Sequence, residues 1–296
     1  MVRPASFSFN YETAANNHFQ QEPLHPGPAL QQTALRQFDG MVKALKAFGV
    51  EVIVIEDNLH PPKPDAIFPN NWFCANNNTV SVFPLFAPSR RPEKRNDILQ
   101  HISRQFIVNG TRDWSHFEES QKYLEGTGSM VIDHVNHIVY ACLSPRTDKA
   151  VLDHFASEHG YSVIAFTATD ASSRPIYHTN VMLCIGEAFA VICDEAIQHE
   201  DERTAVIAKL EQTGHECISI SPAQMNAFAG NMLQLQNKNG ERCIVMSKTA
   251  HRSLHSQQVL KLEKHGALLV VDVSIIEEVE GGSTRCMMAE IFLQPR

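Results

Sequence analysis

Residues 31–55 read QQTALRQFDGMVKALKAFGVEVIVI and show the unit from which the chain is built. Apolar residues at three- and four-residue spacing predict a helix from Gln31 to Phe48. Gly49 follows, and glycine ends helices readily because it adopts the left-handed conformation without steric cost. The apolar run Val50–Ile55 then predicts a strand.

The same order of helix, glycine and strand recurs further along the chain. The predicted helix, glycine and strand are Lys149–His159, Gly160 and Tyr161–Phe166 in the first recurrence; Asp201–Thr213, Gly214 and His215–Ile220 in the second; and Leu254–His265, Gly266 and Ala267–Val273 in the third. Residues 93–106 predict a further helix whose end is less regular, which makes five helices in all. Helices and strands that alternate in this way indicate an α/β fold.

Five apolar runs between these units begin with a small or polar residue. These five strand starts are Asn71, Gly128, Asn180, Asn231 and Cys286, separated by 57, 52, 51 and 55 positions. A period near 50 residues indicates a repeat architecture. We expect a closed ring of five blades with helices outside, whose strand starts line one central pocket. The alternative, a two-layer α/β sheet, spreads the strand starts along a sheet edge.

Composition and charge exclude several classes of protein. The 296 residues carry a formal net charge of −8, with a pI near 6. A sequence-independent nucleic-acid binder needs a basic face to displace counterions, so this class is not expected. No apolar run approaches the roughly 18 residues of a membrane helix, and the first seven residues lack the apolar part of a secretion signal. We expect a cytoplasmic protein that binds neither nucleic acid nor membrane.

The cysteines and histidines form no metal-site pattern. Seven cysteines include no C-x-x-C pair, which suits reduced thiols better than a disulfide framework. Fifteen histidines include no H-E-x-x-H or comparable cluster. We therefore expect neither a metal nor a cofactor. No linker rich in Pro, Gly or Ser divides the chain, so we expect one domain over residues 1–296. The sequence leaves open whether this domain forms a homo-oligomer.

The last strand start carries a thiol. Residues 281–290 read GGSTRCMMAE, so Cys286 follows a flexible Gly-Gly turn and leads into the apolar run Met287–Leu293, a predicted strand. A single cysteine is more often a small buried hydrophobic residue than a nucleophile. Its position at one of five repeated strand starts favours a nucleophile.

Two other strand starts carry complementary groups. Glu125 precedes Gly128 by three residues, and His178 precedes Asn180 by two. A thiol, an imidazole and a carboxylate in one pocket are the groups of thiol-based covalent catalysis.

Four motifs together resemble a known superfamily. They are Asp65-x-x-Phe68-x-x-Asn71, Glu125-Gly126-x-Gly128, His178-x-Asn180 and Cys286 near the C-terminal end. In this order they resemble the signature of the guanidino-group-modifying enzymes, the pentein superfamily. Within it, the chain is most similar to amidinotransferase-like hydrolases linked with citrulline use. More distantly it resembles dimethylarginine dimethylaminohydrolases and arginine deiminases. The resemblance implies a five-bladed α/β propeller of ββαβ repeats with pseudo-fivefold symmetry.

The resemblance also implies roles for individual residues. Cys286 matches the family nucleophile, His178 the general acid and base, and Glu125 the carboxylate that holds the substrate nitrogens and the histidine. Asp65 matches a further substrate contact. Protonated His178 is expected to support the thiolate, since a neighbouring cation lowers the pKa of a cysteine. Arg285 is expected to point away from the pocket, because side chains alternate along a strand.

Two arginines are candidates for binding a carboxylate. Residues 87–91 and 143–147 resemble the dimethylaminohydrolase loops whose arginines bind the substrate carboxylate, which implies this role for Arg90 and Arg146. A guanidinium fork matches a planar carboxylate better than an ammonium does. The alternative is that both arginines are solvent-exposed loop charges.

Asn71 and Asn180 depart from the arginine deiminase pattern, which has aspartates at both positions. A carboxylate only accepts hydrogen bonds and suits a cationic guanidinium, whereas an amide also donates. A ureido group is neutral and offers a carbonyl oxygen to such a donor. We therefore expect a ureido substrate at these two residues.

The predicted function is the hydrolysis of a linear C–N bond in an amino acid with a ureido or guanidino group. Citrulline is the favoured substrate, and it would give ornithine and carbamate through a covalent intermediate on Cys286. The alternatives are an amidinotransferase, an arginine deiminase or dimethylarginine hydrolase, and a non-catalytic binding member of the same fold.

Overall fold

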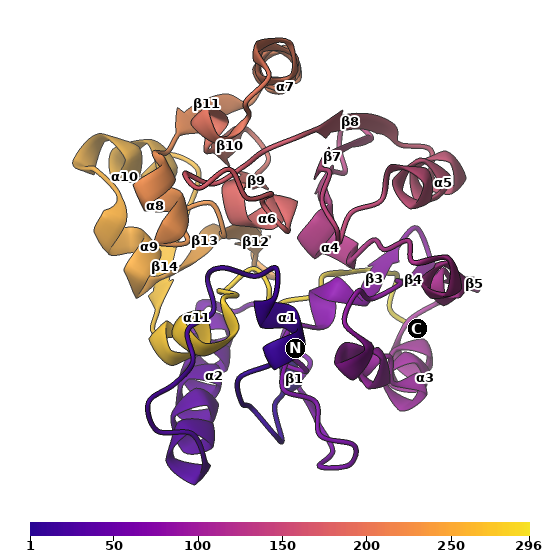
Figure 1. Cartoon of the computed structure of the whole chain (residues 1–296). Helices are drawn as coiled ribbons and strands as arrows, with labels where there is room; N and C mark the ends of the chain where they lie inside the picture. The colour runs from indigo at the N-terminus through magenta and orange to yellow at the C-terminus, as the bar shows by residue number, and fades with distance from the viewer.

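The computed structural model describes residues 1–296 and contains five separate β-sheets. Figure 1 shows these sheets arranged around a common centre, with the long helices at the periphery. Short helical segments lie between these elements. They are α1 (Tyr11–Ala14), η1 (Pro69–Asn71), η2 (Pro88–Glu93), η3 (Ser115–Ser120), α4 (Gly126–Ser129), α6 (Thr179–Met182), η4 (Asp194–Ala196), α8 (Pro222–Asn226) and α9 (Lys248–Ser253). Three of them, α1, α4 and α6, are near the centre in Figure 1.

Four units of the chain have the same order, strand–strand–helix–strand. In each unit the first two strands pair antiparallel, and the third pairs parallel to the second after the helix. A parallel pair needs such a long crossover, which the helix provides. The units are β3 (Phe73–Asn76), β4 (Thr79–Val82), α3 (Asn96–Gln105), β5 (Gly110–Asp113); β6 (Val131–Asp133), β7 (Ile138–Cys142), α5 (Lys149–His159), β8 (Ser162–Phe166); β9 (Leu183–Ile185), β10 (Phe189–Ile192), α7 (Glu200–Gln212), β11 (Glu216–Ser219); β12 (Leu233–Gln236), β13 (Arg242–Ser247), α10 (Ser256–Glu263), β14 (Ala267–Val271).

The remaining elements form a smaller fifth unit from both ends of the chain. Strand β1 (Val2–Arg3) pairs parallel with β2 (Ile55–Glu56) around helix α2 (Pro28–Phe48), and α11 (Ser274–Glu280) packs on α2. Strand β15 (Ile291–Phe292) instead joins the first of the four units, parallel to β3. The predicted α/β class is therefore confirmed. A regular five-bladed propeller stays a prediction, because the fifth unit is not equivalent to the other four.

Two predicted strands are much shorter than expected. The run Val50–Ile55 contributes only Ile55 to a ladder, since β1 offers just two residues as partners. In the run Met287–Leu293 only Ile291 and Phe292 pair with a neighbour. Apolar side chains that pack on the core do not require a strand partner. The predicted helix over residues 254–265 is also shorter: Leu254 caps the end of α9 and His255 caps the start of α10, which covers only Ser256–Glu263.

Helix α2 ends as its sequence predicts and buries the expected face. Gly49 adopts a left-handed conformation with φ 92°, and its N–H bonds back to the carbonyl oxygen of Leu45. Phe38, Met41 and Leu45 are buried on one side of this helix. They share a hydrophobic cluster with Cys286, so α2 supports the segment that carries this thiol.

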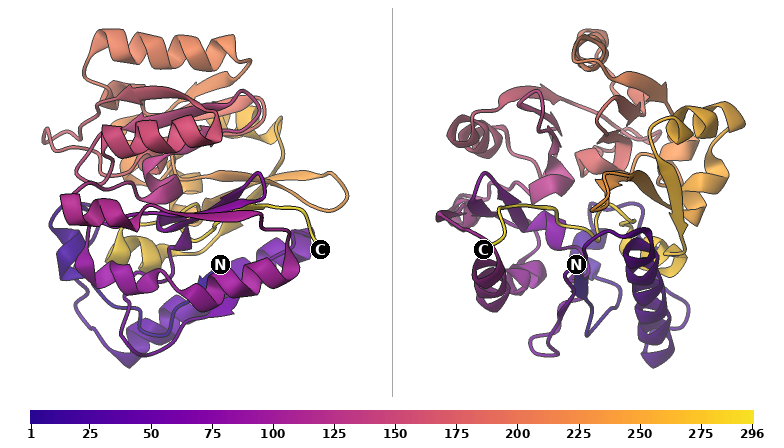
Figure 2. Two further views of the ribbon diagram at one scale, coloured as in Figure 1. Left: turned by 90° about the vertical axis from the view of Figure 1, so that its right-hand side faces the viewer. Right: turned by 180° about the vertical axis from the view of Figure 1, so that it is seen from behind.

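The segment before α2, residues 10–21, covers the centre of the ring and is called the cover segment below. Figure 1 shows α1 in front of this centre. From the opposite side, Figure 2 shows the C-terminal segment crossing the back of the molecule. Gln21 N–H donates to the carbonyl oxygen of Glu278 at 2.7 Å, which ties the cover segment to α11.

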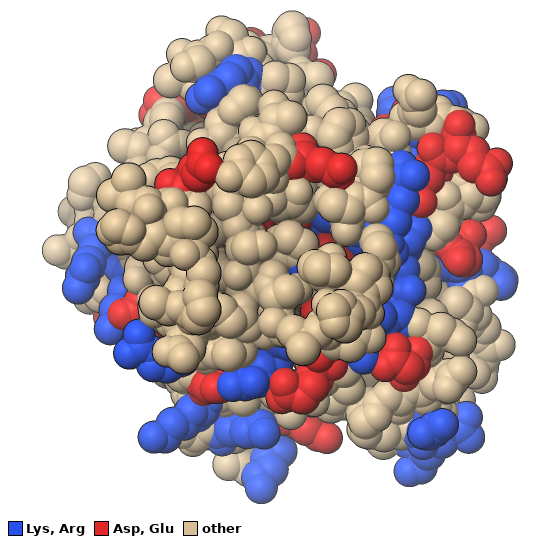
Figure 3. All heavy atoms as spheres, turned by 60° about the horizontal axis from the view of Figure 1, so that its bottom comes forward, with Lys and Arg blue, Asp and Glu red and all other residues tan.

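The surface carries charges of both signs. On the face in Figure 3, acidic and basic side chains lie beside one another around an uncharged area. A narrow column of basic side chains runs down the right of this face, with acidic side chains beside it. No helix combines the length and the apolar character needed to span a membrane.

We predict that Phe38→Ala lowers the free energy of unfolding by about 3–5 kcal/mol, because it leaves a cavity under the fully buried face of α2. Chemical denaturation measures this change. Lys43→Ala, on the exposed face of the same helix, is the matched control and should change stability by less than about 0.5 kcal/mol. Equal effects of the two substitutions would show that α2 is not packed as described.

Candidate active site

The centre of the candidate site is a contact between Glu125 and His178. Each residue directly precedes a short central helix, α4 for Glu125 and α6 for His178, so two repeated units present them at equivalent places. His178 Nε2 lies 2.8 Å from Glu125 Oε2, and both side chains are almost completely buried. Nε2–H donates to this carboxylate, which leaves Nδ1 as the free acceptor of the imidazole.

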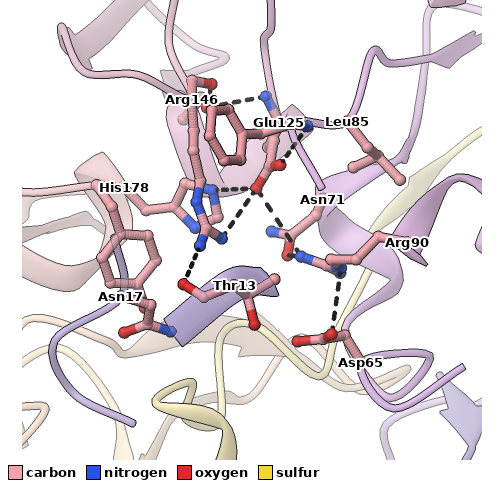
Figure 4. Close-up of polar contacts among 12 residues, drawn as sticks. Thr13, Asn17, Asp65, Asn71, Leu85, Arg90, Glu125, Arg146 and His178 are labelled. Atoms are coloured by element: carbon pink, nitrogen blue, oxygen red, sulfur yellow. Dashed lines mark hydrogen bonds and ion pairs between the residues drawn. The ribbon is translucent and has the colours of Figure 1, made fainter. Parts of the chain in front are cut away.

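Two arginines approach the same carboxylate from either side, as Figure 4 shows. Arg146 Nη1 lies 3.4 Å and Arg90 Nη1 3.8 Å from Glu125 Oε2. The other carboxylate oxygen accepts the backbone N–H of Phe86 at 2.9 Å. Arg90 and Arg146 are each 2% exposed. The alternative that they are solvent-exposed loop charges is therefore wrong.

The surroundings shift the protonation of both central groups. Burial alone would raise the pKa of Glu125, but Arg146, His178 and Arg90 hold it well below its ordinary range. Burial lowers the pKa of His178 to about 4, against the opposite effect of Glu125. His178 is thus neutral at pH 7 in this closed structure. The expected imidazolium beside the thiolate is not present here.

Cys286 lies in a turn over residues 284–287 and receives two side-chain amides. Asn180 Nδ2 lies 3.6 Å and Asn231 Nδ2 3.4 Å from its Sγ. Burial raises the pKa of the Cys286 thiol, whereas the Ser283 backbone and these two amides lower it. Arg285 points away and binds Glu290 at 2.9 Å, as the sequence predicts.

Asn231 fixes the segment around the thiol, a role that the sequence did not indicate. Its Oδ1 accepts the backbone N–H of Arg285 at 3.0 Å, and its carbonyl oxygen accepts the Thr284 hydroxyl at 3.0 Å. Its Nδ2 also donates to the carbonyl oxygen of Asn180 at 2.9 Å. One amide side chain therefore connects two strand starts and the candidate nucleophile.

Gly128 lets Asn71 approach His178. A Cβ at Gly128 would lie 2.5 Å from Asn71 Nδ2 and 2.8 Å from His178 Nδ1, closer than such atoms can come. Asn71 Oδ1 accepts from Arg90 Nη1 at 2.8 Å, so its amide nitrogen faces the imidazole side of the site. Only glycine leaves room for this arrangement.

The cover segment closes the site with polar contacts. Asn10 Nδ2 donates to Asp65, Asn16 Oδ1 accepts from Arg146 Nε at 2.9 Å, and Thr13 accepts from Arg146 through its carbonyl oxygen at 3.0 Å. No periodic signal in the sequence marks these residues, because the segment is an irregular connection with a single helical turn.

All eight residues predicted for the site come together in two adjoining groups, and none is more than 3% exposed. One group surrounds Glu125 and the other surrounds Cys286, and Asn180 follows His178 by two residues on the same helical turn. Sequence reasoning placed Asn231 at a strand start of the central pocket without giving it a role, and it missed Glu93, Glu280 and the cover segment. No cluster of three or more His, Cys, Asp or Glu side chains is arranged to hold a metal ion.

Comparisons with known proteins agree on the fold. The family described as N,N-dimethylarginine dimethylhydrolase, eukaryotic, matches residues 3–293. No curated protein sequence matches the chain. Among solved structures, ArgZ, a cyanobacterial arginine dihydrolase of the ornithine–ammonia cycle, is similar with a TM-score of 0.78 and 14% identity, covering 100% of this chain and 40% of ArgZ. The chain thus spans about 40% of the length of full ArgZ.

Two further structures are similar over nearly their whole length. The N-terminal domain of ArgZ with bound product has a TM-score of 0.77 at 15% identity, with 99% of this chain and 97% of that domain covered. A dimethylarginine dimethylaminohydrolase variant, as an adduct with S-methyl-L-thiocitrulline, has a TM-score of 0.63 at 15% identity, with 97% and 96% covered. At this identity the likeness shows a shared fold.

We predict that the free energy of unfolding decreases as the pH falls from 6.5 toward 4. Since the folded-state pKa of His178 is about 4, below its ordinary value of 6.5, the unfolded chain binds the proton first. The contribution of His178 is fully present above pH 6.5, and its loss at low pH costs roughly 3 kcal/mol of unfolding free energy.

Denaturation at a series of pH values gives the free energy of unfolding as a function of pH. This free energy should fall less steeply between pH 6.5 and 4 for His178→Asn than for the wild type. His25→Asn, at an exposed site, should keep the wild-type slope. The same pH dependence of the unfolding free energy in His178→Asn and in the wild type would contradict the lowered pKa of His178.

Proposed function

The chain belongs to the N,N-dimethylarginine dimethylhydrolase family of the eukaryotic type, and on this premise we propose that it hydrolyses the ureido group of citrulline through Cys286. As a member of this family it is a hydrolase of C–N bonds outside peptides. The proposal includes one cytoplasmic domain over residues 1–296 with a pentein propeller fold, and an amino acid as the substrate.

The observation that carries the choice of citrulline is the pair of amides at the thiol. Asn180 and Asn231 direct N–H donors, not carboxylates, at Cys286 Sγ. A neutral ureido group has a carbonyl oxygen that such donors can bind, and negative charge develops on this oxygen when sulfur attacks its carbon. A carboxylate at the same place would repel that oxygen.

The proposed reaction uses the free acceptor of His178. Nδ1 takes the proton of the Cys286 thiol while sulfur attacks the ureido carbon, and the same proton passes to the departing δ-nitrogen of ornithine. Water then attacks the carbamoyl thioester with His178 as base. The products are ornithine and carbamate, which decays to ammonia and carbon dioxide. Glu125 fixes the orientation of the imidazole through Nε2.

Asp65, Asn71, Arg90 and Arg146 are proposed to bind the amino acid. The guanidinium groups of Arg90 and Arg146 both reach the centre of the site, where an α-carboxylate can replace part of their contact with Glu125. This requires the cover segment to release Arg146 from Asn16.

A guanidino substrate is the second candidate. The site buries four carboxyl groups, those of Asp65, Glu93, Glu125 and Glu280, against two arginines. This excess of acid favours a cationic substrate such as arginine, the compound named for ArgZ, or dimethylarginine. An amidinotransferase shares the covalent step and differs in whether an amine reaches the intermediate before water. The non-catalytic alternative is not supported, because the family is one of enzymes.

We predict that the purified protein releases ornithine and ammonia from citrulline faster than it converts arginine or dimethylarginine. Product assays measure the three reactions, and added glycine or lysine tests for transfer. Cys286→Ser should reduce the activity at least about 1,000-fold with an unchanged melting temperature. Cys217→Ser, at a half-buried cysteine of β11, is the control and should keep activity. Retained activity in Cys286→Ser would disprove its role as nucleophile.

We predict that Asn180→Asp raises the ratio of kcat/KM for arginine to that for citrulline by about tenfold or more, because a carboxylate beside Cys286 repels the ureido oxygen and attracts a guanidinium. The same variant should raise the pKa of the thiol, as measured by the pH dependence of alkylation. Asn226→Asp, an exposed amide, is the control. A faster citrulline reaction in Asn180→Asp would contradict the ureido argument.

A further inference from the structure

A cavity of about 600 Å³ lies beside the cover segment, and the proposed reaction does not use it. None of the eight residues predicted for the active site lines this cavity. Its walls come from the cover segment at residues 18 and 19, from the adjoining residue 21, from the loop over residues 170–174, and from α8, α9 and α11. Figure 1 shows the connection from α1 to α2 passing beside α11. Small-molecule sites typically have volumes of roughly 300–1,000 Å³, so the cavity is large enough for a ligand.

Glu277 of α11 is a buried acid among the residues that line this cavity. It is 3% exposed, and its Oε1 accepts the hydroxyl of Ser283 at 2.5 Å. Its Oε2 has no hydrogen-bond partner. Burial raises the pKa of Glu277, against the opposite effect of nearby hydroxyl groups. A buried carboxyl oxygen without a donor is costly, and a bound N–H donor would remove that cost.

The cavity contains more acidic than basic side chains. Arg174 is the only Lys or Arg on its walls, and Asp170 already binds this guanidinium at 2.7 Å. His18 is neutral at pH 7, because partial burial and the charge of Arg174 lower its pKa. Glu277 and the exposed Glu278 are therefore two acids for which the walls supply no cation.

The rest of the lining fits an organic ion better than a metal ion. The rings of Phe19 and Phe228 both line the cavity, with their centroids 5.5 Å apart. Aromatic rings contact alkyl chains and attract organic cations. An ammonium group has three N–H donors and no acceptor, so it matches a carboxylate that lacks a donor.

We propose that this cavity binds a small organic dication, such as a linear diamine, with one ammonium group at Glu277 and the other at Glu278. The alkyl chain lies against the rings of Phe19 and Phe228. The proposal goes beyond the proposed function and does not depend on it.

Glu277 connects the cavity to the segment of the thiol. The hydroxyl that it accepts belongs to Ser283, and the carbonyl oxygen of Ser283 accepts the backbone N–H of Cys286 at 3.0 Å. The cavity also joins the cover segment to α11, because Gln21 N–H donates to the carbonyl oxygen of Glu278 at 2.7 Å. A ligand in the cavity contacts both parts and favours their closed arrangement. Since Cys286 is 3% exposed in this closed form, the diamine lowers access to the thiol and acts as an inhibitor.

The first test measures binding of 1,4-diaminobutane by calorimetry, with 1,4-butanediol as the uncharged molecule of the same length. The wild type should bind the diamine at least about tenfold more tightly than the diol. Glu277→Gln should weaken diamine binding about 30-fold, because removing one partner of a buried charge pair is costly. Glu278→Gln should weaken it about threefold, since an exposed pair contributes less. The melting temperature of each variant checks its folding.

Two control variants locate the diamine. Glu263→Gln removes an exposed acid of α10 outside the cavity, and Asp65→Asn removes a buried acid of the candidate active site. Both should keep the wild-type affinity for 1,4-diaminobutane. A loss of affinity in Asp65→Asn as large as that in Glu277→Gln would place the diamine in the active site and overturn the proposal.

The second test measures the link to the thiol without turnover. Iodoacetamide alkylation of Cys286 is followed by mass spectrometry in a Cys217→Ser background, because Cys217 is the only cysteine that is not buried. Saturating 1,4-diaminobutane should slow this alkylation at least about threefold, and 1,4-butanediol should not. Adding Glu277→Gln should remove the effect of the diamine.

Each result decides one part of the proposal. Absence of diamine binding to the wild type, or equal affinity of the wild type and Glu277→Gln, would overturn the site. Unchanged alkylation of Cys286 with the diamine bound would overturn its action as an inhibitor. Failure to turn over citrulline, arginine or dimethylarginine would overturn the proposed function and leave both measurements valid.

Discussion

The arrangement of the centre depends on one buried carboxylate. Glu125 accepts from His178, and it lies within 3.8 Å of a guanidinium nitrogen of both Arg90 and Arg146. These partners come from different parts of the ring, so their contacts with one carboxylate hold several units together. An isolated buried carboxylate would be protonated or excluded from the core. The partners and Glu125 therefore require one another, and their contact fixes the relative positions of the loops that carry them.

The repeat gives this contact its geometry. Glu125 and His178 each stand directly before a short central helix, and Asn71 ends the equivalent helical turn of another unit. Because equivalent backbone positions around a ring point at the same centre, residues about 50 positions apart in sequence become neighbours. The ring explains why chemically unlike side chains meet there. It does not by itself select which side chains they are.

Much of the fold was readable from the sequence, and the reasons for the failures are physical. Helix α5 has the predicted bounds Lys149–His159, because its apolar face and Gly160 are both local signals. The run Val50–Ile55 failed as a strand since pairing depends on a distant partner, β1, that offers only two residues. Glu125, His178 and Cys286 were found because each stands next to a repeated strand start. Asn231 was seen as a strand start but given no role, and Glu280 belongs to a helix that the sequence did not predict. Asn231 contacts Cys286 and Glu280 contacts Gln20, and such contacts between segments far apart in the chain are not visible in the sequence.

The fifth unit has a consequence for how the chain reaches its native state. Helix α2 belongs to the first part of the chain, whereas α11 and Cys286, which pack with it, belong to the last. The ribosome therefore makes nearly every other site residue before the thiol, and α2 must wait for its partner while four similar units form. Contacts between such distant segments carry a large loop-closure entropy and slow the final step of folding. Incomplete chains present the buried face of α2 to solvent, and a nascent chain gains its nucleophile only when this last contact closes.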